Sequence, residues 1–125
     1  MTLTIAAAAA ISVHGQVTIG SDVVPQKGVL LNLQDQTPNA DNETVRKGGL
    51  GMPRVKLVNR NTLEPFVSKT DPDWIAAGTS KIKEHHAGLT VYNINDTEIK
   101  DTSVLETTFR LGFYVWNGKQ WKEAD

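Results

Sequence analysis

Three segments of this chain carry glycine at or near their start and continue into short runs of β-prone residues. They are residues 47–57, 88–93 and 112–118. Glycine permits a tight turn before a strand, and alternation along a strand sends every second side chain to the same face. Residues 16–20 and 29–33 show the same β-branched or aliphatic character. The pattern therefore predicts several short strands joined by turns, which restricts the chain to a mainly β fold.

One short helix is predicted between the strands, over residues 70–78. Thr70 or Asp71 can cap its first turn, and Pro72 suits the first helical position. Gly78 is placed to end it. The charged segment 81–86 that follows is predicted to be solvated.

A hairpin is predicted at the C-terminal end of the sequence. Asn117-Gly118 is a dipeptide that favours a type I′ turn, because that turn needs positive φ at both central residues. We expect residues 114–116 to fold back on residues 120–122.

The remaining connections are polar, and the apolar content is modest. Residues 34–46 and 95–106 are predicted loops, and 39% of the chain is hydrophobic. A chain of 125 residues forms one domain at most and buries a small core, so oligomerisation would give it useful support. We expect a mainly β fold, a small multi-stranded sheet or sandwich of short strands with one or two short helices, either alone or intertwined in a trimer.

The first fifteen residues have the composition of a secretory signal peptide. An apolar run that includes Ala6–Ala10 is too short to cross a bilayer and matches the hydrophobic region of such a peptide, although no Lys or Arg precedes it. The alternative is an alanine-rich helix that packs within the domain. We expect residues 1–15 to be removed on export, residues 16–125 to form one β-rich module, and the protein to reach the cell surface, the extracellular space or the periplasm without a membrane span.

Enzyme chemistry, cofactors and metals are not expected. The chain has no cysteine, and its only histidine cluster, His85-His86, lacks the i,i+2 or i,i+4 spacing of a chelating pair. Its carboxylates lie in predicted loops and caps, and no spacing selects a catalytic pair among them. A net charge of −1 spread along the sequence also argues against nucleic acid as a partner.

Four aromatic residues, Tyr92, Tyr114, Trp116 and Trp121, are the candidates for a binding surface. They could form a platform for stacking a glycan or for contacting a protein. They could equally form the core of a small sheet. The core is favoured, because a chain with only 6% aromatic residues needs them inside.

Five pieces of sequence, in order, resemble a module of exported Bacteroidetes cell-surface proteins. They are residues 16–20, residues 27–33, Gly-Leu-Gly-Met-Pro-Arg-Val at 49–55, Gly-Leu-Thr-Val-Tyr-Asn at 88–93, and the segment 112–121 with its Gly-Phe-Tyr-Val-Trp-Asn-Gly. The module is also similar to segments of tail-fibre-like surface proteins. The resemblance implies an exported protein, and the similarity to tail-fibre-like proteins implies a trimeric, fibrous β structure.

Two functions remain open at this stage. The first is a structural, assembly or adhesive surface module that associates with itself as a homotrimer or with another surface protein or glycan. The second is a small monomeric carbohydrate- or protein-binding domain that uses the aromatic C-terminal hairpin. A hydrolase that acts through a loop carboxylate is a distant third.

Overall fold

The computed structural model describes residues 15–97 and 102–124. The predicted signal peptide (residues 1–15), or the alanine-rich helix that is its alternative, lies outside the described residues except for Gly15. Internal contacts divide the chain into two compact units, one reaching to Leu50 and the other starting at Gly51. We call their described parts the N-terminal unit (residues 15–50) and the C-terminal unit (residues 51–97 and 102–124). The expectation of one module over residues 16–125 stays a prediction.

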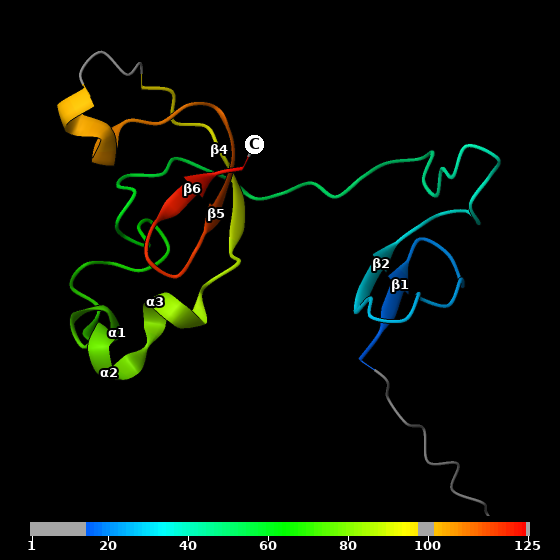
Figure 1. The fold of residues 1–125 in the computed structure, drawn as a ribbon, viewed down its shortest axis with the longest axis horizontal. Helices are drawn as coiled ribbons and strands as arrows, with labels where there is room; N and C mark the ends of the chain where they lie inside the picture. The colour runs from blue at the N-terminus through cyan, green and yellow to red at the C-terminus, as the bar shows by residue number, and fades with distance from the viewer. Residues whose placement is uncertain (1–14, 98–101, 125) are drawn as a thin grey trace, which may run out of the picture. The chain divides into compact units, whose positions relative to one another are not determined.

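The N-terminal unit is built on a parallel pair of three-residue strands (Figure 1). Strand β1 spans Val17–Ile19 and strand β2 spans Leu31–Leu33, so both lie within the stretches predicted to be strands. Their register places Val17 beside Leu31 and Ile19 beside Leu33. Backbone hydrogen bonds extend the pair at both ends, from Val17 N to Leu30 O (2.8 Å) and from Gln34 N to Ile19 O (3.1 Å).

The C-terminal unit contains a four-stranded sheet in the order β3-β4-β5-β6. The strands are β3 (Arg54–Val55), β4 (Thr90–Asn93), β5 (Gly112–Trp116) and β6 (Trp121–Glu123). β3 and β4 run parallel, whereas β4, β5 and β6 form an antiparallel meander. Two small sheets of short strands confirm the predicted mainly β fold.

One face of this sheet carries the core of the C-terminal unit. Alternation along the strands turns Val91, Tyr114 and Trp116 to the same side, and β6 adds Trp121. Seven hydrophobic side chains with at most 1% exposure form this cluster: Leu57, Leu63, Val91, Phe109, Tyr114, Trp116 and Trp121. The sheet is therefore covered on one side by its own chain.

Three single-turn helices replace the one helix predicted for residues 70–78. They are α1 (Pro72–Ile75), α2 (Ala77–Ser80) and α3 (Ile82–His85). The predicted start is correct, because the Asp71 carboxylate accepts a hydrogen bond from the Asp73 N–H at 2.8 Å. The predicted end at Gly78 is wrong, since the break before α3 falls instead at Lys81, which adopts a left-handed conformation (φ 58°).

Helical turns also occur beyond the predicted helix. α3 lies in the charged segment 81–86, where the Lys83 carbonyl accepts a hydrogen bond from Trp116 Nε1 at 2.7 Å. A 3₁₀ helix, η1, spans Thr102–Thr107 and overlaps the predicted loop 95–106. The bond between α3 and a core tryptophan is a tertiary contact that the local sequence does not encode.

The C-terminal hairpin is present, but its register differs from the prediction by one residue. Trp116 pairs with Trp121, and residues 114–116 therefore lie opposite residues 121–123. Only Gly118 of the predicted turn dipeptide has positive φ (97°), so the turn is not type I′. The Asn117 side chain explains the longer loop, because its Oδ1 accepts hydrogen bonds from the backbone N–H groups of Lys119 and Gln120, both at 2.9 Å.

Candidate assembly surface

The β1–β2 pair presents a face made only of aliphatic side chains. Val17 and Ile19 from β1 lie beside Leu31 and Leu33 from β2, because the parallel register aligns the same alternation in both strands. Val17, Ile19 and Leu31 are 50%, 56% and 53% exposed, and Leu33 is half-buried. We call these four residues the aliphatic face. An apolar sheet face with this exposure lacks a covering layer within its own unit.

The rest of the N-terminal unit does not supply that layer. Among residues 15–50, the only buried side chain is that of the polar residue Gln34, which is 7% exposed. All the fully buried hydrophobic side chains of the described chain belong to the C-terminal unit. Aromatic residues follow the same division, since every Phe, Tyr and Trp in the sequence comes after residue 51. The N-terminal unit therefore has aliphatic surface but no hydrophobic core of its own.

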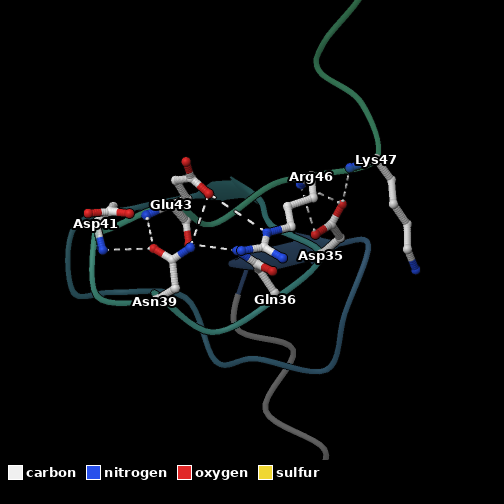
Figure 2. Close-up of polar contacts among 7 residues, drawn as sticks. All are labelled: Asp35, Gln36, Asn39, Asp41, Glu43, Arg46 and Lys47. Carbon is white, nitrogen blue, oxygen red and sulfur yellow. Dashed lines mark hydrogen bonds and ion pairs between the residues drawn. The ribbon is translucent and has the colours of Figure 1, made fainter.

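Polar contacts, rather than apolar packing, hold the loop between β2 and the end of this unit (Figure 2). The Asp35 carboxylate accepts hydrogen bonds from the backbone N–H groups of Arg46 (3.2 Å) and Lys47 (2.9 Å). Asn39 Oδ1 accepts one from the Glu43 N–H at 2.9 Å. The Arg46–Glu43 ion pair, at 3.7 Å between exposed side chains, adds little to this arrangement. These contacts return the chain to the end of the β1–β2 pair.

A hollow forms where the returning chain meets the aliphatic face. It has a volume of about 470 Å³, and its apolar lining comes from Ile19, Leu33, Val45 and Leu50. Leu50 is itself 62% exposed. The hollow therefore continues the apolar surface beyond the ends of the two strands.

The structure separates the four aromatic residues that were the sequence candidates for a binding surface. Tyr114, Trp116 and Trp121 have no exposed area and belong to the core of the C-terminal unit. The tryptophan rings pack edge to face at 5.6 Å between centroids, and the Trp121 indole N–H donates to the Thr62 carbonyl at 2.8 Å. Their burial fits the alternative in which these residues form the core.

Tyr92 is the one candidate that lies on the uncovered face of the C-terminal sheet. It stacks edge to face on Phe113 at 5.2 Å between ring centroids, and the two residues are cross-strand partners. Both rings line an open groove of about 500 Å³ with Met52 and Arg54. Of the four aromatic residues, only Tyr92 offers ring surface to a ligand, and a binding role for it stays a prediction.

Residues 15–97 and 102–124 contain no candidate metal site. This part of the chain holds no group of three or more His, Asp or Glu side chains placed to bind a metal ion. It also holds no helix with the length and hydropathy needed to cross a bilayer.

Sequence reasoning did not identify the aliphatic face as a functional surface. Both strands were predicted, and alternation along residues 29–33 places Leu31 and Leu33 on the same face. What the sequence did not reveal is that the two strands pair in parallel, which joins two pairs of aliphatic residues into one surface.

Comparison with known protein families identifies the family of this chain. A family model described as a phage tail-like trimerisation region matches residues 18–125, which include β1 except its first residue Val17, all of β2, and all of the C-terminal sheet. No curated protein and no solved structure matches the chain.

Proposed function

Since the chain belongs to the phage tail-like trimerisation region family, we propose that it is a structural module that holds three copies of its polypeptide together. One observation of the structure carries this proposal: the N-terminal unit has exposed aliphatic strands and no buried hydrophobic side chain among its described residues. A structural or assembly role follows from the family. The trimer of this particular chain is the proposal.

The physical reason for assembly is the lack of a core in the N-terminal unit. A sheet of two strands is marginally stable by itself in water, and three or more strands with a packed apolar face are needed for independent stability. Here each strand has only three residues. Association of several copies would bury aliphatic side chains that a single copy leaves in water, and burial of that area favours the assembled state.

The location and wider role of the module extend this proposal. A tail-fibre-like module would act at a surface, so we propose that the protein lies outside the cytoplasm. Its role there would be display or adhesion. The sequence resemblance to exported Bacteroidetes surface proteins supports that placement. The monomeric binding domain has weaker support, because three of its four proposed contact residues are buried.

The test is the mass of the chain in solution. Size exclusion with light scattering should give three times the mass of the single chain, which is 13.7 kDa for residues 1–125. Residues 16–125, as a second sample, should likewise give three times their own mass. A mass equal to the single chain at all concentrations would contradict the proposal. A dimer or a tetramer would keep self-association and reject the threefold assembly.

A further inference from the structure

We infer that the aliphatic face, formed by Val17, Ile19, Leu31 and Leu33, is the surface on which the three copies of the chain meet. This inference rests on the proposed trimer and adds the surface through which the copies associate. The occupant of the face is therefore the same face of two further copies. Three features of the structure support the assignment.

The first feature is the absence of charge on the aliphatic face. In an assembly with a threefold axis, a side chain on the axis meets two copies of itself. A charged residue there would face like charges at short distance, which is unfavourable, whereas aliphatic side chains can pack. All four residues of the face are aliphatic, and three of them are at least half exposed. Such a face can meet its own copies without repulsion.

The second feature is the direction and register of the strands. Rotation about a threefold axis leaves the direction of a strand along that axis unchanged, so the three copies of one strand are parallel along the axis. β1 and β2 are also parallel to each other within one chain. Val17 lies level with Leu31, and Ile19 lies level with Leu33. Three copies would thus bring together two successive layers of aliphatic side chains. The hollow beside Ile19 and Leu33 extends the apolar surface past the second layer.

The third feature is that the competing surface is less suited to the axis. The uncovered face of the C-terminal sheet carries Tyr92 and Phe113, but it also carries the exposed cations Arg54 and Lys122. These cations would approach their own copies if this face lay on the axis. The C-terminal sheet also has a packed core on its other side, so it already buries apolar surface within its own chain. The N-terminal unit has no such core.

The experiment compares a negative charge placed on each of the two faces. Ile19→Glu and Leu31→Glu alter side chains that are more than half exposed, so neither removes a core contact of the single chain. Phe113→Glu is the matched control, since Phe113 is 45% exposed on the C-terminal sheet. Light scattering on the full chain should show trimers for the unaltered chain and for Phe113→Glu, and monomers for Ile19→Glu and Leu31→Glu. Near-ultraviolet circular dichroism of the buried tryptophans should be the same in all four samples.

Cysteine crosslinking gives a second readout that does not depend on dissociation. The natural chain has no cysteine, so a single introduced thiol can form a disulfide only between copies. Ile19→Cys should crosslink into covalent dimers under mild oxidation while the trimer is intact, and Phe113→Cys should crosslink at the slow rate of random collision.

The outcomes separate this inference from the proposed function. Trimers that persist in both Ile19→Glu and Leu31→Glu would overturn the assignment of the face and leave the trimer standing. Dissociation by Phe113→Glu, or fast crosslinking of Phe113→Cys, would move the contact to the C-terminal sheet and also overturn it. A monomeric unaltered chain would refute the proposed function, and the inference with it.

Discussion

At the scale of single residues, Asn93 shows how a polar side chain can organise a core. It is fully buried in β4, and its Oδ1 accepts hydrogen bonds from the N–H groups of Leu57 (3.1 Å) and Asn95 (3.0 Å). Its Nδ2 donates to the carbonyls of Asn95 (2.9 Å) and Arg110 (2.8 Å). One amide thus links three chain segments around the end of the sheet.

Replacement of this amide by a carboxyl group should be costly and pH-dependent. In Asn93→Asp the two carbonyls lose their donor and face a buried negative charge, so the free energy of unfolding should fall by roughly 3 kcal/mol or more at pH 7. Burial and the two facing carbonyls raise the pKa of the new carboxyl, whereas the two N–H groups that donate to Oδ1 lower it. We expect the first two effects to prevail at this fully buried position, so that the folded-state pKa lies above the unfolded value of about 4. The loss of stability should therefore be small below about pH 4 and grow as the pH rises towards the folded-state pKa.

Urea unfolding followed by tryptophan fluorescence at several pH values would measure this effect. Asn61→Asp is the control, because Asn61 is exposed and the substitution is chemically the same. Equal pH profiles for the two variants would show that the Asn93 amide does not hold the core as described.

The sequence predicted the placement of many residues but not their partners. Strand alternation correctly set Val91 and Asn93 on one face and Tyr92 on the other. The buried hydrogen bonds of Asn93 join positions 36 and 17 residues away, and no local pattern encodes such distances. Similarly, composition favoured the core for the aromatic residues, but only the fold separates Tyr92 from the other three.

At the scale of elements, the C-terminal hairpin depends on one side chain in its loop. Asn117 Oδ1 accepts two backbone hydrogen bonds, from Lys119 and Gln120, and so sets the four-residue loop that pairs Trp116 with Trp121. Because side-chain period is two, a shift of one residue would turn Trp121 out of the core. The register is thus fixed jointly by Asn117 and by the packing of two tryptophans.

Removal of the Asn117 carbonyl should loosen the hairpin without unfolding the unit. We expect Asn117→Ala to lower the free energy of unfolding of the C-terminal unit by about 1 kcal/mol, because two loop N–H groups lose a protein acceptor but gain water. Asn117→Asp keeps an acceptor at this position and should stay close to the natural chain. Chemical denaturation would test this, and an Asn117→Asp variant as unstable as Asn117→Ala would contradict the explanation.

Element types were more predictable than element boundaries and pairings. Glycine and alternation located the strands, and Asp71 and Pro72 correctly marked a helix start. The helical region then forms three separate turns. Lys81 adopts positive φ and separates the last turn, α3, from α2. α3 also contacts Trp116 through the Lys83 carbonyl, a contact that the charged sequence of α3 does not indicate. The parallel pairings β1–β2 and β3–β4 join strands across long connections, and neither connection has a sequence signal for its partner.

At the scale of the whole molecule, the two units differ in how they distribute buried and exposed apolar side chains. The C-terminal unit has the hydrophobic cluster, the buried aromatic pairs and the larger sheet. The N-terminal unit has a loop held by polar contacts and an aliphatic face without cover. The chain belongs to a family of trimerisation regions. In the proposed trimer, the N-terminal unit would therefore gain more from association than the C-terminal unit.

This division predicts that the C-terminal unit folds without the N-terminal unit. Residues 51–125 expressed alone should be a monomer with cooperative thermal unfolding and the near-ultraviolet signal of the full chain, since the whole hydrophobic cluster lies within them. Size exclusion with light scattering and circular dichroism would test both properties. A fragment that is unfolded would show that the core needs the first fifty residues, and a trimeric fragment would place an association surface within the C-terminal unit.

The uneven distribution of aromatic residues has a consequence for the time course of assembly. Because every Phe, Tyr and Trp comes after residue 51, intrinsic fluorescence during refolding reports on the C-terminal unit and is almost blind to the aliphatic strands. Collapse of one chain is a first-order event, whereas encounter between chains becomes faster with protein concentration. Different probes would therefore record the two events: tryptophan fluorescence would follow collapse of the chain, and light scattering would follow association. Comparison of the two time courses would show which event comes first.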